Sequence, residues 1–181
     1  MSKLLSPELH NLKVVESNEL VRASYKLSKR CLVFIYYLVA KLDSIQPDSF
    51  TDFVLSYEQI VAILNFDGKR RISKRKEVFH IMDELNHAPI YWENAEDAVQ
   101  VNRLSSVTHH KNTDEFRLRL DPALRPHLLQ LRQHFTEFFY KYILPMDSSA
   151  SIRLYGLLKS YHSGNGVMEK IFAVEDLKFR L

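Results

Sequence analysis

The 181-residue chain lacks the features that several classes of protein require. Its one cysteine, Cys31, excludes an internal disulfide framework and a cysteine-rich zinc site. The 4 glycines and 6 prolines are too few for a collagen-like or low-complexity chain, and the glycines form no phosphate-binding loop. The sequence contains no nucleophile elbow and no second pair of metal ligands to accompany His109-His110. We therefore expect a protein that is not an enzyme and that holds no cofactor and no metal.

Long hydrophobic runs are also missing. The longest covers residues 31–40 (CLVFIYYLVA) and is bracketed by Lys29, Arg30 and Lys41. A helix that crosses a bilayer needs about 20 such residues, and a signal peptide would not follow a mostly polar stretch of this length. We predict that residues 31–40 belong to a buried helix, that the protein makes no membrane contact, and that it resides in a reducing cytoplasm.

What the chain does contain is typical of a folded domain. Hydrophobic residues make up 46% of it and charged residues 26%, so enough apolar surface is present to offset the entropy of ordering the backbone. A domain has roughly 100–200 residues, which allows one domain or two small ones. The formal net charge is only +3, so the position of the cations matters more than their number.

Periodicity and capping residues predict helices in the N-terminal half. Ser28 can cap a central helix, and Ser56 with Gln59 has the spacing of a capping box. The turn Asn65-Phe-Asp-Gly68 joins two of these helices, which is typical of a helix-turn-helix. The predicted helices are a short one after Ser17-Asn18 with Leu20, Ala23, Ser24 and Leu27 on one face, one from Lys29 to about Ser44, one from Tyr57 to Leu64 with Ile60, Ile63 and Leu64 buried, and one from about Arg70 to Asn86 with Val78, Ile81, Met82 and Leu85 buried.

A period of two then predicts strands. Residues 53–55 are a short strand candidate. After Pro89, Val99 and Val101 alternate with polar residues, as do Phe116, Leu118 and Leu120. We predict a hairpin of these two stretches, with the polar residues 105–115 forming its long tip. A hairpin that follows a helix-turn-helix is a wing.

Further helices are expected in the C-terminal part. The predicted elements are a long helix from Pro122 and Pro126 to Pro145 with Leu128, Leu131, Phe135, Phe138 and Tyr142 on one face, a helix capped by Ser148-Ser149 with Leu154, Leu157, Leu158 and Tyr161 inward, a strand from about Val167 to Val174, and a helix beginning at Glu175. Together these elements predict an α+β, mostly helical fold, namely a winged helix-turn-helix with a small antiparallel sheet.

Cations crowd the start of the second helix of the predicted helix-turn-helix. They are Lys69, Arg70, Arg71, Lys74, Arg75 and Lys76. Because a helix N-terminus carries a partial positive charge, each exposed cation there costs about 0.3–1 kcal/mol. DNA phosphates would remove this conflict, since they accept hydrogen bonds from backbone amides and from guanidinium groups. We interpret the cluster as a DNA contact; the alternative is a solvated surface.

Other polar residues are weaker candidates. Arg117 and Arg119 on the wing extend the predicted DNA-contacting track, and Arg103 and Lys111 could lengthen it further. We interpret His109 and His110 as ordinary loop histidines of the wing tip. Cys31 lies in the most apolar helix, where a thiol stays protonated and inert, and Trp92 is interpreted as a core residue or a partner contact.

Several stretches resemble the N-terminal half of plasmid replication initiators of the Rep_3 type, which bind repeated origin sequences called iterons. The resemblance covers about residues 14–180. It rests on Val14-Val-Glu-Ser-Asn-Glu-Leu20 with Ala23-Ser-Tyr25 and Leu27-Ser28, on Phe116-Arg-Leu-Arg-Leu-Asp-Pro122 with Leu131 and Phe135-Thr136, and on Ser151-Ile-Arg-Leu-Tyr155 with Leu158 and Tyr161. Three motifs in the same order and spacing identify the chain as similar to this family.

The resemblance implies a protein of tandem winged helices in the bacterial cytoplasm. Its first domain dimerises and contacts the DNA backbone, and its partners are double-stranded iteron DNA, a second copy, and host replication factors and chaperones. On this basis we expect a flexible arm over residues 1–13, a winged-helix domain over 14–174, and the start of a linker or second domain over 175–181. The tail could instead dock back on the domain.

Three functions remain open from the sequence. The first is the DNA-binding and dimerisation domain of a plasmid replication initiator that represses its own gene. The second is a protein-interaction module that dimerises and binds little DNA. The third is a stand-alone winged-helix repressor, which would bind its sequence without a second domain.

Overall fold

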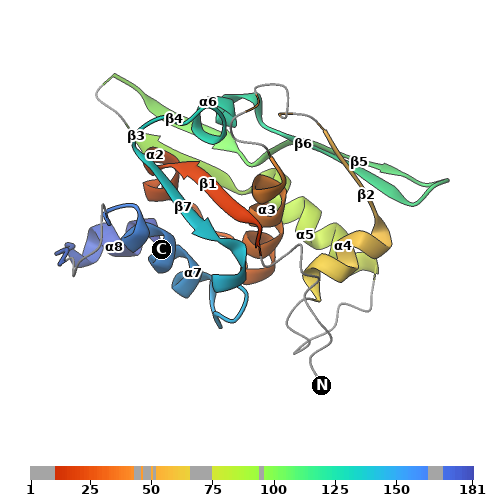
Figure 1. Ribbon diagram of the computed structural model, residues 1–181. Helices are drawn as coiled ribbons and strands as arrows, with labels where there is room; N and C mark the ends of the chain where they lie inside the picture. The colour runs from red at the N-terminus through yellow and green to blue at the C-terminus, as the bar shows by residue number, and fades with distance from the viewer. Residues whose placement is uncertain are drawn as a thin grey trace.

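The computed structural model describes residues 11–42, 46, 50, 52–65, 75–93, 96–162 and 169–181. It mixes helices with three small antiparallel sheets, which confirms the α+β prediction (Figure 1). Within the described ranges, no helix is both long and apolar enough to span a membrane. Residues 1–10 of the predicted arm lie outside the described residues.

Helix α3 (Lys29–Lys41) forms the centre of the molecule. Ser28 caps it as predicted, its Oγ accepting a hydrogen bond from the Cys31 amide at 3.3 Å. The side chains from Cys31 to Tyr36 are all buried, because strand β1 (Lys13–Ser17), helices α4 (Tyr57–Leu64), α5 (Arg75–His87) and α7 (Ser149–Lys159) all pack around this helix. Burial raises the pKa of the Cys31 thiol well above its usual range, which fits an inert core residue.

Helices α4 and α5 form the predicted helix-turn-helix. The capping box at the start of α4 is present, with Ser56 Oγ accepting from the Gln59 amide and Gln59 Oε1 accepting from the Ser56 amide. The predicted inward faces of both helices are confirmed. The described part of the second helix begins at Arg75, and the predicted turn residues 66–68, with residues 69–74, lie outside the described residues.

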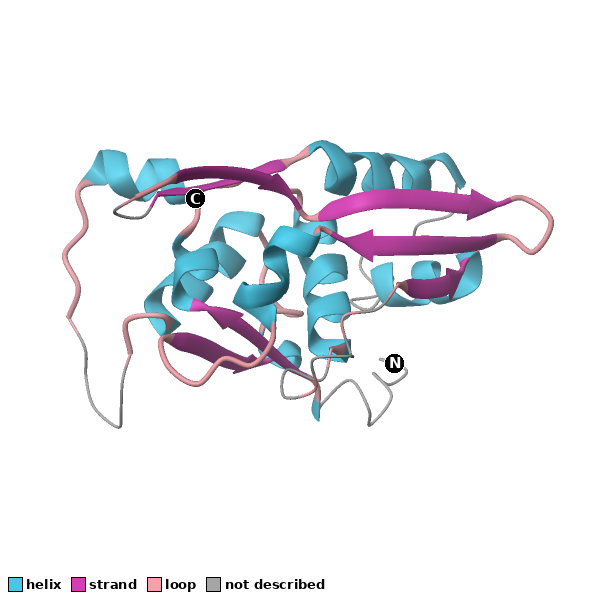
Figure 2. Cartoon of the chain, turned by 90° about the horizontal axis from the view of Figure 1, so that it is seen from above, coloured by secondary structure: helices cyan, strands magenta, loops and turns pink. Residues whose placement is uncertain are grey.

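The wing is a sheet of three strands in the order β2-β6-β5. Its strands are β2 (Phe53–Ser56), β5 (Leu104–His110) and β6 (Glu115–Leu120), and the long β5–β6 hairpin (Figure 2) contacts helix α5 through β5. The prediction that residues 105–115 are a loop is therefore wrong, since residues 105–110 are strand. Serine, threonine and histidine hide the alternation there, because each can face either solvent or a half-buried surface.

The strand predicted to pair with β6 pairs elsewhere. Strand β4 (Ala98–Asn102) forms a separate hairpin with β3 (Pro89–Glu93), with Ile90 opposite Val101. Only Arg103 separates β4 from β5, so one continuous stretch of chain serves two sheets. The period-two pattern was correct, but it does not specify which strands pair.

The predicted long helix over residues 122–145 is wrong. This segment contains the 3-10 helix η2 (Pro122–Leu124), the helix α6 (Arg125–Leu128), the strand β7 (Phe135–Phe139) and the 3-10 helix η3 (Tyr140–Tyr142). Gln130 and His134 both have φ of 54°, which ends helical geometry on the N-terminal side of β7. Strand β7 pairs antiparallel with β1, which gives β1 its hydrogen-bond partner. On β7 Thr136 and Phe138 are buried, whereas Phe135 is 42% exposed.

The first predicted helix is shorter than its pattern suggested. Helix α2 covers only Asn18–Arg22, capped by Ser17 as predicted. Beyond it the chain is not helical, because Ser24 exchanges two backbone hydrogen bonds with Tyr91 of β3, at 2.7 and 2.8 Å. Tertiary pairing with β3 thus replaces the last turn of the predicted helix.

At the C-terminal end, the cap of helix α7 by Ser148 is as predicted, and the predicted buried face is correct at Leu157. The helix also buries Ile152, Arg153 and Gly156, whereas Leu158 is 40% exposed. The predicted strand over 167–174 is absent from its described part, residues 169–174, because residues 169–173 are irregular and Val174 opens helix α8 (Val174–Arg180). Ser24 Oγ donates to the Phe179 carbonyl, so α8 contacts the segment after α2.

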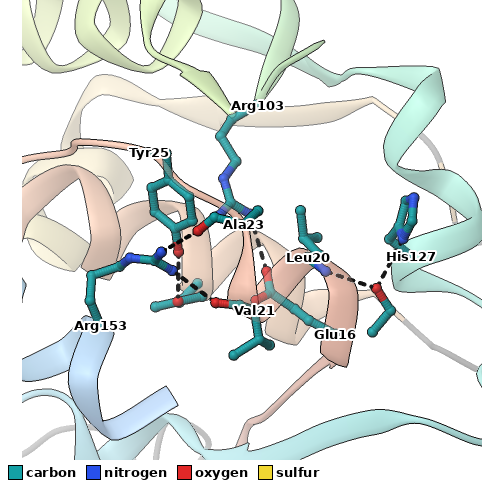
Figure 3. A network of polar contacts seen from close by, with 10 residues as sticks. Glu16, Leu20, Val21, Ala23, Tyr25, Arg103, His127 and Arg153 are labelled. Carbon is teal, nitrogen blue, oxygen red and sulfur yellow. Dashed lines mark hydrogen bonds and ion pairs between the residues drawn. The ribbon is translucent and has the colours of Figure 1, made fainter. Parts of the chain in front are cut away.

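A polar network lies inside the domain (Figure 3). The Arg103 guanidinium is buried beside Glu16, and both Arg103 and Arg153 lie over the ring of Tyr25, with Cζ at 4.4 and 3.6 Å from its centroid. Arg153 also donates to the carbonyls of Val21 and Ala23. The prediction that Arg103 belongs to a surface track on the wing is therefore wrong, because this side chain leaves the strand at the β4–β5 junction and points into the core.

Candidate nucleic-acid interface

The start of helix α5 and the tip of the wing are joined by one bidentate ion pair. Arg75 donates from Nη1 to Oδ1 of Asp114 at 2.7 Å and from Nη2 to Oδ2 at 2.5 Å. The Arg75 guanidinium also lies over the ring of Tyr57, 4.9 Å from its centroid. Two elements far apart in the sequence thus form one surface.

Asp114 occupies the turn at the wing tip in a left-handed conformation, with φ of 56°. Aspartate tolerates this conformation better than most residues. Its amide donates to the His110 carbonyl, its own carbonyl accepts from the Tyr57 amide at 3.0 Å, and its Oδ1 accepts from His109 Nε2 at 2.9 Å. The hydrogen bond from His109, together with Arg75, holds the pKa of the Asp114 carboxyl below its ordinary value.

An aromatic cluster joins the wing to α5 beneath this pair. The His109 ring is stacked on Phe116 at 4.6 Å and meets Phe79 edge-on at 5.1 Å. Phe79 comes from α5 and is 40% exposed, whereas Phe116 is buried. His109 is therefore a packed strand residue rather than the loop histidine that the sequence suggested.

The two arginines of strand β6 differ in their surroundings. Arg119 is held by Asp52, which precedes β2, at 2.8 Å from Nε and 2.9 Å from Nη2. This contact lowers the pKa of the Asp52 carboxyl. Arg117 is exposed and has no ion-pair partner among the residues that the structure describes. Of the two, Arg117 is the more available to an external phosphate.

The structure places the predicted site residues unequally. Arg75 and Lys76 are exposed at the start of α5, Arg117 and Arg119 are exposed on β6, and Lys111 is exposed at the wing tip. The predicted contacts Lys69, Arg70, Arg71 and Lys74 lie outside the described residues.

A pocket of about 680 Å³ lies beside the first turns of α3 and α5. Its cations Lys29, Arg30 and Lys76 are interleaved with carboxylates. Glu84 accepts a hydrogen bond from the Ser28 amide at 2.5 Å, and Glu77 lies 3.4 Å from Arg30. Because its charges are mixed, this pocket is a poorer place for a phosphate than the exposed wing.

Sequence reasoning missed the acidic partners, Asp52 and Asp114. A signal was present for Asp114, because Lys111-Asn-Thr-Asp114 is a stretch of turn residues between two alternating segments. No comparable local pattern marks Asp52, whose role depends on the pairing of β2 with β6. Among the described residues, no cluster of three or more histidine, cysteine or acidic residues is arranged to hold a metal ion.

Residues 13–159 match the family model described as Initiator Replication protein, WH1. The chain belongs to this family. Among solved structures, this WH1 domain is similar to one described as the crystal structure of Pi initiator protein in complex with iteron DNA. The TM-score is 0.58 at 17% identity, over 94% of this chain and 73% of the other. A comparison with curated protein sequences finds no match. At this identity the structural likeness confirms the winged-helix fold.

Family membership and fold explain the arrangement described above. The matched residues begin at β1 and end with α7, so they include the helix-turn-helix, both hairpins and the β1–β7 sheet. The resemblance found in the sequence is thereby confirmed. In this WH1 domain Arg75 and Lys76 are exposed on the start of α5, exposed cations also lie on the wing, and Arg103 and Arg153 are buried in the core.

Proposed function

We propose that this WH1 domain binds double-stranded DNA at the iterons of a plasmid origin, as part of an initiator of replication in the bacterial cytoplasm. The observation that carries the proposal is the joining of α5 to the wing tip by Arg75 and Asp114, with Lys76 exposed on α5, Lys111 exposed at the wing tip and Arg117 exposed on β6. Support also comes from a protein of the same fold that is described in complex with iteron DNA. The role is binding rather than catalysis.

In this proposal the domain contacts the DNA backbone. The predicted cluster Lys69, Arg70, Arg71, Lys74, Arg75 and Lys76, whose last two residues begin α5, meets phosphates, and Arg117 and Arg119 meet them along the wing. Contacts to phosphate fix the orientation of a protein on the duplex without reading its sequence. Base reading is assigned to a second winged-helix domain, with residues 175–181 as the beginning of the connection to it.

Salt dependence tests the proposal. If four to six phosphates are neutralised, the logarithm of the binding constant falls against the logarithm of the salt concentration with a slope of about −3.6 to −5.4, from roughly 0.9 per phosphate. Replacing Arg117 by alanine is expected to reduce the slope by about 0.9 and to weaken binding to any sequence equally. Lys159→Ala is the matched control, because this lysine is exposed at the end of α7.

Two results would contradict the proposal. One is a binding constant that does not change with salt. The other is unchanged binding after replacement of Arg70, Arg71, Lys74 and Arg75 together by alanine.

Dimerisation is the second part of the proposal. Within the part of the chain that the structure describes, β3 is the one strand that pairs with β4, so the other edge of β4 is the edge at which a second copy would add a strand. If the chain dimerises without binding DNA, it is instead a protein-interaction module. Light scattering gives the molecular mass of the chain in solution, and titration with an iteron duplex gives its affinity for DNA.

Repression of its own gene, and contacts with host replication factors and chaperones, belong to the same proposal.

A stand-alone repressor is the remaining alternative. It predicts that this chain alone prefers its operator over an unrelated duplex by a large factor. The initiator proposal predicts similar affinities of the isolated WH1 domain for both duplexes, because phosphate contacts carry no sequence information.

A further inference from the structure

One residue of the wing tip, Asp114, bonds to both helices of the helix-turn-helix and to strand β5. The side chain of Asp114 holds Arg75 of α5 and His109 of β5, and its backbone bonds the Tyr57 amide at the start of α4. It therefore joins both helices of the helix-turn-helix to the wing, at the turn between β5 and β6.

We propose that Asp114 is a positioning residue for DNA binding, which holds Arg75 and the wing tip in one arrangement so that α5 and the wing reach the same duplex together. This inference rests on the proposed function and extends it to a residue that carries the wrong charge for a phosphate contact. Asp114 does not touch DNA in this account; it acts through Arg75 and through the wing.

The hydrogen-bond inventory of the pair supports this role. A guanidinium has five N–H donors. Asp114 accepts two of those of Arg75, so three remain for a phosphate in an orientation fixed by the carboxylate and by the Tyr57 ring. A bidentate pair fixes the plane of the guanidinium, which a single contact would leave free to rotate.

Strand β6 offers an internal comparison. Asp52 also holds its arginine in a bidentate pair, although Arg119 donates from Nε and Nη2 rather than from Nη1 and Nη2, and both aspartates have a lowered pKa. Asp52 precedes β2 and Arg119 lies on β6, which are already paired strands of one sheet. The Asp52 pair therefore fixes little that the sheet does not fix, whereas the Asp114 pair joins the tip of the wing to helix α5.

The test compares Asp114→Asn with Asp52→Asn. Each substitution raises the net charge by one, so electrostatics alone would tighten DNA binding in both. In Asp114→Asn the turn can keep its conformation, because asparagine also tolerates positive φ, but its amide N–H₂ meets an N–H of Arg75. We expect binding of a mixed-sequence DNA duplex to weaken on the order of tenfold in Asp114→Asn, as for loss of a charge-assisted contact, and to strengthen in Asp52→Asn.

A second readout needs no DNA. Spin labels on cysteines introduced at His80 of α5 and Asn112 of the wing tip report the distance between these elements, since both positions are exposed and the buried Cys31 is unreactive. We expect a narrow distance distribution in the labelled parent and in Asp52→Asn, and a broad one in Asp114→Asn. Arg75→Gln breaks the same pair from the α5 side, leaves the turn intact, and is also expected to broaden the distribution.

The outcomes separate the inference from the proposed function. If Asp114→Asn binds DNA as tightly as the unsubstituted chain, or more tightly, the Asp114 carboxylate only neutralises the charge of Arg75 and does not position it. That result would overturn the inference. An unchanged distance distribution in both Asp114→Asn and Arg75→Gln overturns it as well. If the unsubstituted chain binds no DNA, the proposed function fails and the inference fails with it, whatever the distances show.

Discussion

The guanidinium of Arg103 lies in the core with its Nη1 3.1 Å from Oε1 of Glu16, and both side chains are almost fully buried. Glu16 is on β1 and Arg103 links β4 to β5, so this pair connects the strand at one side of α3 with the junction of two sheets. Taking two charges out of water is costly, and their mutual attraction offsets that cost only in part.

Removing one partner of this pair should destabilise the domain strongly. We expect Arg103→Met to lower the free energy of unfolding by about 3–5 kcal/mol, because Glu16 is left as an uncompensated buried charge. The double substitution Glu16→Leu with Arg103→Met should recover most of that loss, since neither charge of the pair remains buried without its partner. Urea denaturation measures both, and a double variant no more stable than the single one would refute the argument.

Arg153 connects the core to helix α8. Its Nη2 donates to the Arg180 carbonyl at 2.6 Å, and Arg180 in turn donates from Nη1 to the Arg22 carbonyl at 2.5 Å. The side chains of α8 are not buried, so these polar contacts hold the helix in place. We expect Arg180→Ala to speed hydrogen exchange in α8 while α3 stays protected, because opening of α8 leaves the core packed. Lys178→Ala is the control, as its partner Glu175 lies within α8 itself.

His127 gives the stability of the domain a pH dependence. Burial lowers the pKa of His127 below the ordinary histidine value of 6.5, against the opposing effect of Glu19. The ring lies 5.0 Å from that of Trp92 and its Nδ1 is 2.9 Å from Ser17 Oγ. Because the unfolded chain binds this proton more readily than the folded one, the contribution to stability is present above pH 6.5 and is lost as pH falls through the folded-state pKa.

Substitution of His127 isolates its contribution to the pH dependence of stability. In His127→Gln, urea denaturation below pH 6.5 should show a smaller loss of stability than in the unsubstituted domain. His87→Gln is the matched control, because His87 is exposed and its ring bonds to Asp83 of the same helix. An equal loss of stability with and without His127 would assign the pH dependence to the carboxylates instead.

The capping box of α4 should contribute to the stability of the helix-turn-helix. Ser56→Ala removes the acceptor of the Gln59 amide, and we expect a loss of about 1 kcal/mol in the free energy of unfolding. Ser56→Asp keeps an acceptor at the same position and should restore most of the loss, which thermal denaturation can measure. If the aspartate variant is as unstable as the alanine variant, the cap is not the cause.

Local chemistry in the sequence determined several elements by itself. Helix α3 was predictable because residues 31–40 are apolar on every side and Ser28 precedes them, and α4 because Ser56 and Gln59 satisfy each other's amides. The buried face of α5 followed from the helical period alone. In each case the deciding interactions lie within a few residues of one another, so the pattern along the chain contains them.

Only the tertiary structure decided the rest. Residues 135–139 match a helical stripe and a strand equally well, and the need of β1 for a hydrogen-bonding partner selected the strand. Arg103 could have pointed into solvent or into the core, and the buried carboxylate of Glu16 selected the core. The pairing of Arg75 with Asp114 likewise depends on how the wing folds over α5. Such contacts join residues distant in the sequence, and their free energy depends on the whole assembled fold.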